Sequence, residues 1–469
     1  MLFNSVHFLI FLFFFYIFYI SSKHKVQNYL LLAGGWIFYS FWNYKMSFLL
    51  LSSIIMNFFL GKRIYKSPKA KWLLGIGVTL NLLVLVAFKY TFFLGSVFND
   101  LSSILGMGKP IPILNILLPI GISFYTFHNI SYIIDIYKGR INPTFDFVTF
   151  SIYDLFFPLL LSGPIERAEN LIPQIENERI VVFSDFSSGV YLFAWGVFKK
   201  VFIADNLAAF VNSSLEPQNQ IPTGLIYLTA FSFAFQVYAD FSGYTDAARG
   251  LAKMMGFRLS HNFLIPFLSP NPSEFWKRWH ISLSTWLRDY LYIPLGGNKY
   301  GMFRQNINLL IVWILGGLWH GATYGYLIWG FYCGIQIIGY NLFYNYILKY
   351  SINLPSYFLG VIKYSGIFLT FWLFALGLLL FRVENYSHLV RILSNLQGFY
   401  FNGMLIFKIL FFIFPILFVQ SIQIYKKEME IFNFKVLHPL VFTGMVVVFF
   451  IQFNLFGIFE SKEFFYFQF

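Results

Sequence analysis

The chain has 469 residues, of which 58% are hydrophobic and 11% are charged, and Phe alone accounts for 64 positions. A water-soluble chain of this length would divide into roughly two or three cores joined by polar linkers, and no soluble domain has so apolar a composition. The composition therefore excludes a soluble protein and indicates an integral membrane protein. The single cysteine, Cys333, also excludes a disulfide framework within the chain and a metal site built from several cysteines.

The net charge of +13 at pH 7 would suit a nucleic acid or an anionic membrane surface, so the positions of the charges must decide. The Lys and Arg residues stand mainly in loops between apolar stretches, and they form no run interleaved with aromatic residues that could stack on bases. Membrane lipid is therefore the expected partner, and nucleic acid is set aside.

Apolar stretches near the length that spans a bilayer, about twenty residues, recur along the whole chain. In chain order they are 2–20, 28–43, 46–60, 72–97, 112–136, 188–212, 222–246, 306–319, 323–347, 357–381, 403–425 and 437–456. The segments 28–43, 46–60 and 306–319 are short enough to be tilted hairpin arms or re-entrant pieces. We therefore predict an all-α polytopic membrane protein with about 11–13 transmembrane or re-entrant helices plus interfacial amphipathic helices.

Neither a polar linker nor an internal repeat interrupts the sequence, so residues 1–469 are expected to form a single membrane domain. Its helices fall into an N-terminal set (1–97), a central part (about 112–350) and a C-terminal set (357–469). Most of the 33 Lys and Arg residues fall on one side of the membrane when alternate loops are assigned to opposite sides. The positive-inside rule makes that side cytoplasmic and places both termini outside.

Charged groups within apolar stretches are the next clue, because they are costly at membrane depth. Lys199 and Lys200 lie in the middle of segment 188–212, close to Asp205. Two interpretations stay open for these lysines. Their amines could snorkel to an interface, or they could contact an anion such as a phosphate-bearing donor or a lipid.

Asp240 and Asp246 stand in a polar string at the end of an aromatic segment. Six residues of continuous helix would put them on opposite sides, so they are not expected to act as a paired acid and base. We expect each carboxylate to pair with a separate group. Hydrogen bonding that fixes the helix bundle is favoured over direct catalysis.

A helix start is indicated at Asn271, which suits an N-cap and is followed by Pro272 and, three residues after the cap, by Glu274. The sequence predicts an amphipathic helix lying in the cytoplasmic interface. Its apolar face would carry Trp276, Trp279, Leu283 and Leu287, with Lys277, Arg278, Ser284, Arg288 and Asp289 elsewhere and His280 beside the apolar face. A lone His in such a place is more often a packing residue than a catalyst.

His320 gives a sharper signal, because glycines flank it on both sides in a stretch between two apolar segments. These glycines allow a helix break, or close approach of another backbone or of a substrate. A neutral imidazole there could take a proton from a hydroxyl, which makes His320 the best candidate for a general base. No HxxxH or HExxH pattern is present, so no metal site is expected.

These residues together resemble the membrane-bound O-acyltransferase family, in particular its bacterial alginate O-acetylation type. The resemblance covers nearly the whole chain. It is carried by Met1-Leu2-Phe3-Asn4-Ser5, Leu118-Pro119-Ile120-Gly121, Phe157-Pro158 with Ser162-Gly163-Pro164-Ile165, Phe198-Lys199-Lys200, Asp240-Phe241-Ser242-Gly243-Tyr244-Thr245-Asp246, the run from Phe275 to Tyr290, and Trp319-His320-Gly321.

The resemblance implies the membrane-bound O-acyltransferase fold, with a family-defining core at about 112–350. It implies transfer of an acetyl group from a cytoplasmic thioester, acetyl-CoA or another, to an extracytoplasmic polysaccharide such as alginate or peptidoglycan, with no resident cofactor. His320 matches the family's catalytic histidine, and His280 matches a second histidine near the acyl passage. Contact with the donor or its passage is further expected of Lys199, Lys200, Asp240, Asp246, Trp276, Arg278 and Arg288.

The resemblance also implies the bacterial cytoplasmic (inner) membrane as the location and a separate periplasmic protein of the SGNH type, similar to acetyltransferases and esterases, as a partner. A more distant branch of the family moves D-alanine toward teichoic acid, and the long portion from residue 357 onward favours the polysaccharide branch. Two other classes stay open. A transporter or flippase would have the polar residues without acyl chemistry, and a structural scaffold would tolerate the loss of both histidines.

Overall fold

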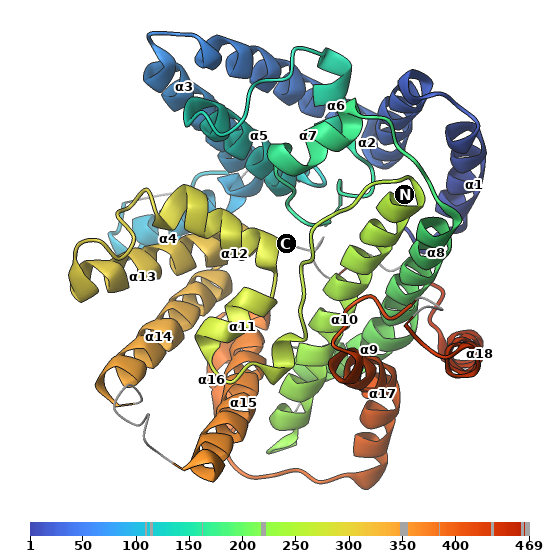
Figure 1. The fold of residues 1–469 in the computed structure, drawn as a ribbon. Coiled ribbons are helices and arrows are strands. Elements are labelled where there is room, and N and C mark those ends of the chain that lie inside the picture. The colour runs from blue at the N-terminus through green and yellow to red at the C-terminus, as the bar shows by residue number, and fades with distance from the viewer. Residues whose placement is uncertain are drawn as a thin grey trace. The chain divides into compact units, whose positions relative to one another are not determined.

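The computed structural model describes residues 1–107, 110–112, 116–161, 163–216, 222–347, 355–383, 385–432, 436–460 and 464. All regular secondary structure within these ranges is helical, which confirms the predicted all-α class (Figure 1). The chain forms two compact units, one of Met1–Phe193 with Ala247–Ser260 and the other of Ala194–Asp246 with His261–Phe469. Ser162, a residue of the motifs named above, lies outside the described residues.

The helices of the first unit pack around α2, which contacts α1, α3, α5 and α6 (Figure 1). In chain order they are α1 (Val6–Ile20), α2 (His24–Tyr65), α3 (Ala70–Lys89), α4 (Thr91–Ile104), α5 (Ile122–Tyr137), α6 (Phe147–Leu155), α7 (Ala168–Glu176) and the first part of α8 (Phe183–Phe198).

The long helix α2 consists of two arms that meet at Asn43, whose backbone is not helical (φ −160°, ψ 108°). The hydroxyl groups of Ser40 and Ser47 are 3.2 Å apart, although seven residues of straight helix would rise by about 10 Å. The chain therefore turns sharply at Asn43. The turn lies where the predicted segments 28–43 and 46–60 meet.

Polar side chains inside this apolar unit find partners across the helices. Asn57 on α2 and Asn81 on α3 exchange two hydrogen bonds between their amides, of 3.1 and 2.8 Å. Glu166, which follows α6, is buried and accepts hydrogen bonds from the backbone and hydroxyl of Ser260 and from Asn170. Such pairs are required where water is not available to hydrogen-bond the amide and carboxylate groups.

The second unit begins with the end of α8 and includes most of α10 (Leu225–Met254). It also contains a π-helix (Lys199–Ala204), α9 (Asp205–Leu215), α11 (Pro272–Arg278), α12 (Ile281–Leu287), a π-helical turn (Arg288–Tyr292), α13 (Gly301–His320), α14 (Tyr324–Tyr346), α15 (Ser356–Leu378), a 3₁₀ turn (Leu379–Arg382), α16 (Tyr386–Ser394), α17 (Gly403–Lys426) and α18 (Pro439–Phe456). The pair α13 and α14 makes the most extensive contact (Figure 1).

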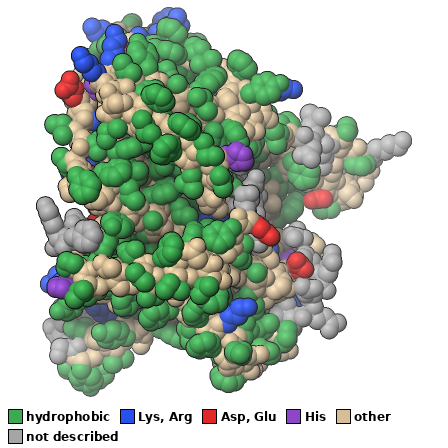
Figure 2. Space-filling view, turned by 90° about the vertical axis from the view of Figure 1, so that its right-hand side faces the viewer, with side chains coloured by type: hydrophobic (Ala, Val, Ile, Leu, Met, Phe, Trp, Pro, Cys, Tyr) green, Lys and Arg blue, Asp and Glu red, His purple; other side chains and the backbone are tan. Residues whose placement is uncertain are grey.

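Five helical spans among the described residues are long and apolar enough to cross a membrane. They are His24–Tyr65, Ala70–Lys89, Tyr357–Arg382, Gly403–Lys426 and Pro439–Phe456. Hydrophobic side chains also cover most of the face drawn in Figure 2, where charged side chains are sparse. A surface so rich in exposed Phe, Leu and Ile is suited to contact lipid tails rather than water.

The predicted segments differ from these helices in three places. Segment 72–97 divides at Tyr90 into α3 and α4, and segment 188–212 divides into α8, the π-helix and α9. Segment 112–136 becomes helical only from Ile122, and its residues 113–115 lie outside the described ones. The helices α6, α7 and α16 were not predicted, because each has nine residues and is too short to give an apolar stretch of spanning length.

Close approach between α13 and α14 depends on glycine. A Cβ atom added at Gly317 would lie 2.3 Å from the carbonyl oxygen of Tyr326 and 2.9 Å from the Cα of Gly330. Neither of these backbone atoms can rotate away as a side chain would. Small residues therefore set the distance between the two helices that surround His320.

We predict that Gly317→Ala destabilises the protein by about 1–3 kcal/mol, because the new methyl group must push the two helices apart. The measurement is the midpoint of thermal unfolding in detergent. Gly339→Ala on α14 is the matched control, since a Cβ there meets nothing within 4 Å. Equal midpoints for the two variants would contradict the packing argument.

Candidate active site

The chain breaks between α11 and α12 at Trp279 and His280. The helix α11 begins as predicted, because the side chain of Asn271 accepts a hydrogen bond of 2.8 Å from the backbone N–H of Glu274. It ends at Arg278, and His280 takes the left-handed conformation (φ 45°, ψ 54°) before α12 starts. This conformation is uncommon for any residue other than glycine and persists only where the surroundings hold it.

Asn262 is the residue that holds this break. Its backbone carbonyl accepts from the N–H of Ile281 at 3.0 Å, and its side-chain Oδ1 accepts from the N–H of Ser282 at 3.2 Å. Nearby, the N–H of Leu264 donates to the carbonyl of Arg278 at 3.0 Å. These three bonds occupy backbone groups that a continuous helix would have paired internally.

The prediction of one continuous helix through this stretch is therefore wrong. Trp276 and Trp279 are buried within the second unit, and the ring centroid of Trp279 lies 4.7 Å from that of Phe374 on α15. Because of the break, Trp279 packs against Phe374 while the imidazole of His280 packs against Phe241. Helical spacing alone could not reveal it, because the residue that holds the break, Asn262, lies outside the predicted helix.

His280 has an apolar, aromatic environment. Its side chain is buried, with 1% of the residue exposed. The ring of Phe241 on α10 meets the imidazole edge to face, with centroids 4.6 Å apart, and the ring of Trp319 lies at 5.7 Å. Burial lowers the pKa of His280 to about 3, because the cationic form would lose its hydration. The imidazole is therefore neutral at pH 7.

His320 is the last residue of α13, and the chain becomes extended at Gly321. The residue is 7% exposed, and three aromatic rings surround its imidazole. The centroid distances are 4.9 Å to Trp319, 5.1 Å to Trp329 and 5.5 Å to Phe381. The helix therefore ends where the sequence indicated a break, and the negative end of the helix dipole favours positive charge on this imidazole.

Trp319 connects the two histidines, because its ring contacts both imidazoles. Trp276 joins the same aromatic group through Trp329, with centroids 5.9 Å apart. The structure thus brings together His280, His320 and Trp276 among the predicted site residues. Aromatic rings therefore pack against both imidazoles, and an apolar environment of this kind suits chemistry that excludes water.

Lys199 and Lys200 form a second polar group, and both lie in the π-helix with 3% exposure. The Nζ of Lys200 lies 3.0 Å from Asp205 and 2.8 Å from Asp240, while that of Lys199 lies 2.7 Å from Asp246. The two aspartates therefore pair with separate lysines, as predicted. The snorkelling interpretation is wrong, because the lysines are buried and the anions in contact with them are carboxylates of the chain.

Helix α10 contacts both the lysine network and His280. Asp240 and Phe241 are neighbours on α10, and the first pairs with Lys200 while the second packs against His280. A π-helix has an extra residue in its turn, which changes the direction of the side chains that follow and is frequent at functional sites. The ion pairs thus fix the position of α10 behind one of the two histidines.

Arg278 and Arg288 each form an ion pair with an acidic residue close in sequence. Arg278 forms an ion pair with Glu274 at 3.6 Å, and Arg288 forms one with its neighbour Asp289 at 2.8 Å. The side chain of Arg278 is 35% exposed and that of Arg288 is 59% exposed. Their assignment to the donor or its passage stays a prediction. Among the described residues, no group of three or more His, Cys, Asp or Glu side chains is arranged to hold a metal ion.

Four residues of the site were missed from the sequence, namely Asn262, Phe241, Trp329 and Phe381. Phe241 stands within the Asp240–Asp246 motif, so its neighbours could have indicated it. Phe381 comes from a distant part of the chain, and no local pattern connects it with His320. Aromatic residues are so frequent here that their type alone gives no signal.

We predict that Lys200→Met destabilises the protein by about 3 kcal/mol or more, because two buried carboxylates lose their shared cation. Thermal unfolding in detergent measures this loss. Adding Asp240→Asn to the variant should recover part of it, since one uncompensated charge is then removed. Lys277→Met is the control, because its ion pair with Glu274 is exposed and contributes little. Similar losses for Lys200→Met and the control would contradict the prediction.

Comparison with known proteins places these residues in a family. The model of the membrane-bound O-acyltransferase family matches residues 141–363, which include both histidines. A probable alginate O-acetylase of Pseudomonas aeruginosa is 41% identical over 391 residues, covering 82% of this chain and 72% of the relative.

The names of two further relatives give a different polymer or a different transferred group from that of the alginate O-acetylase. A peptidoglycan O-acetyltransferase of Helicobacter pylori is 32% identical over 391 residues, covering 77% of this chain and 72% of the relative. A teichoic acid D-alanyltransferase of Bacillus subtilis is 29% identical over 287 residues, covering 58% and 71%. The extent of the match to the O-acetylating relatives shows that the chain belongs to the membrane-bound O-acyltransferase family.

Proposed function

We propose that this protein moves an acetyl group from a thioester donor on the cytoplasmic side across or at the membrane for the O-acetylation of an extracytoplasmic polysaccharide. The observation that carries the proposal is the buried pair His280 and His320, which share contact with Trp319 at the end of a helix. The similarity to alginate and peptidoglycan O-acetylating proteins supports the acetyl group and the polysaccharide class.

In the proposed reaction, His320 is the general base. Its imidazole takes the proton of the acceptor hydroxyl as the oxygen attacks the thioester carbonyl. A new C–O ester bond forms, the C–S bond breaks, and the departing thiolate receives the proton from the imidazolium. The C-terminal end of α13 stabilises the positive charge on His320 during this transfer.

His280 has a supporting part in this proposal. Its neutral imidazole contacts the ring of Trp319, which also contacts His320. The strained backbone at the break fixes the direction of the His280 side chain. His280 helps to orient the acyl group among the aromatic rings, and Trp276 closes the same group from the side of α11. The lysine network maintains this arrangement through α10. The donor is acetyl-CoA or another acyl thioester, and no resident cofactor takes part.

The membrane separates the two substrates in this proposal. The basic loops face the cytoplasm, so both termini lie outside in the bacterial cytoplasmic membrane. A separate periplasmic protein of the SGNH type completes transfer to the polymer. Alginate and peptidoglycan are the acceptors favoured by the relatives, and D-alanyl transfer to teichoic acid is the second candidate, favoured by the match to the D-alanyltransferase.

We expect His320→Ala to abolish acetylation, because no other group replaces the base. Cells that produce the variant are compared with cells that produce the unaltered protein for ester-linked acetate on cell-wall and exported polysaccharides, measured by mass spectrometry. Membrane insertion and protein amount are measured in parallel. Normal acetylation by a correctly inserted His320→Ala variant would eliminate the general-base assignment.

His280→Ala should reduce acetylation without abolishing it, since the base remains while the orientation of the acyl group is lost. His7→Ala is the matched control, because His7 is exposed in the first unit and should be silent. If His280→Ala equals the control in initial rate and in its dependence on donor concentration, the supporting part of His280 is wrong.

The chemical class is tested with membranes that contain the protein and with acetyl-CoA labelled in the acetyl group. Label that reaches polymer hydroxyls in a His320-dependent manner supports the proposal. A transporter without acyl chemistry would transfer no label, and a scaffold would be indifferent to both histidine substitutions. D-alanine in place of acetate on the polymer would establish the second candidate.

A further inference from the structure

The turn between α2 and α3 carries a concentration of positive charge. Lys62, Arg63, Lys66, Lys69 and Lys71 fall within ten residues, and the sequence contains no Asp or Glu before Asp100. Among the described residues, no carboxylate forms an ion pair with Lys69 or Lys71. These two side chains are exposed, so their charge is available to an outside anion.

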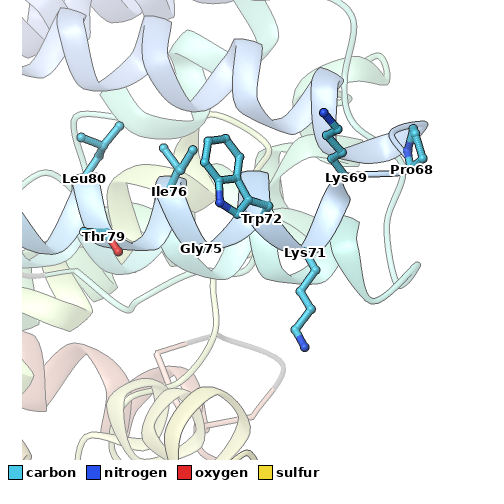
Figure 3. Close-up of a pocket in the computed structure, with 8 residues that line it drawn as sticks. All are labelled: Pro68, Lys69, Lys71, Trp72, Gly75, Ile76, Thr79 and Leu80. Carbon is cyan, nitrogen blue, oxygen red and sulfur yellow. The ribbon is translucent and has the colours of Figure 1, made fainter.

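A groove begins at these lysines and continues along α3, with a volume of about 810 Å³. Figure 3 shows Trp72, Ile76 and Leu80 in a row along one side of α3, with Lys69 near the start of the same side. The other residues that line the groove are Pro68, Lys71, Gly75 and Thr79. Its wall is therefore cationic at one end and mainly apolar along the rest.

The length of this groove matches one leaflet of a bilayer. From Lys69 to Leu80 the helix rises by about 16 Å, and half of the hydrocarbon core is about 15 Å thick. The helix α3 is also one of the candidate spans, and it starts at Ala70, so Lys69 and Lys71 stand at its end, where headgroups lie. Trp72, 69% exposed, is the residue type expected at that level.

Gly75 keeps the middle of the groove open. A Cβ atom added there would meet nothing within 4 Å, so the helix surface at this point faces free space. Glycine lowers helix stability relative to alanine, and no close packing against another part of the chain offsets that cost here. An occupant that lies along the helix would explain an open surface at this position.

We propose that this groove binds an anionic phospholipid, with its phosphate at Lys69 and one acyl chain along Trp72, Ile76 and Leu80, which lie on the same side of α3 as Lys69, whereas Lys71 points to the opposite side (Figure 3). The occupant must be anionic at one end and apolar for about 16 Å. A nucleic acid or an acidic protein segment does not combine these two properties. Basic clusters next to membrane spans attract anionic lipids in this manner. The proposal does not depend on the acyl chemistry at the histidines.

The test uses the full chain in phosphatidylcholine nanodiscs that contain equal small fractions of a tail-brominated phospholipid, either phosphatidylglycerol or phosphatidylcholine. Bromine quenches tryptophan fluorescence at short range, and the difference between the unaltered protein and Trp72→Phe isolates the signal of Trp72. We expect the brominated phosphatidylglycerol to quench Trp72 at several-fold lower content than the brominated phosphatidylcholine.

Two variants address the two ends of the groove. Lys69→Gln should weaken the preference for phosphatidylglycerol by about fivefold. Lys71→Gln should weaken it less, because the side chain of Lys71 points to the opposite side of α3. Gly75→Leu should weaken quenching by both lipids, because its side chain occupies the groove without a clash at Cβ. The controls are Lys426→Gln with Lys427→Gln, which remove two basic residues at the end of α17, and Gly339→Leu, another glycine with open space.

Equal quenching by the two lipids would mean ordinary annular lipid and would overturn the proposal. It would also be overturned if the lysine and Gly75 variants behaved like their controls. If an oligonucleotide or an acidic peptide displaced the quencher more effectively than unlabelled phosphatidylglycerol, the groove would belong to a different class of partner. A selective response that depends on Lys69 and Gly75 supports the proposal.

Discussion

Charged groups within the apolar interior of this protein are stabilised by partners within the chain, and much of the structure depends on this constraint. Lys200 is the strongest case, because one buried ammonium is shared by Asp205 and Asp240. The cost of removing these charges from water is offset only by close, direct contacts. The ion pairs therefore leave α10 few alternative positions. Phe241 lies on the same helix and packs against His280, so the ion pairs also fix the position of this contact.

The two histidines lie at two different kinds of helix terminus. His280 lies where a helix is interrupted and Asn262 takes up the freed backbone groups, whereas His320 lies where a helix simply ends. Neither site could tolerate an uninterrupted helix. Aromatic rings pack against both imidazoles, and the Trp319 ring contacts each of them. The arrangement is suited to chemistry that must exclude water.

The sequence was sufficient for the fold class, for most helices and for the N-cap at Asn271, because these depend on local composition and spacing. It also predicted that Asp240 and Asp246 have separate partners, because six residues of helix separate their directions. It could not predict that the helix stops before His280, since the cause is the pair of hydrogen bonds that Asn262, a residue outside that helix, accepts from the N–H groups of Ile281 and Ser282. Nor could it find Phe381, whose contact with His320 joins residues 61 positions apart through packing alone.

The π-helix at Lys199–Ala204 limits where residues can be inserted or deleted in members of the family. With one extra residue in the turn, the neighbouring lysines reach carboxylates at different levels of α10, one near Asp246 and the other near Asp240. Deletion of a single residue here would restore a regular helix and rotate all of α9 by about 100° relative to α8. Insertions and deletions should therefore be absent from this turn in relatives that keep the lysine pair, while loop lengths elsewhere remain free to change.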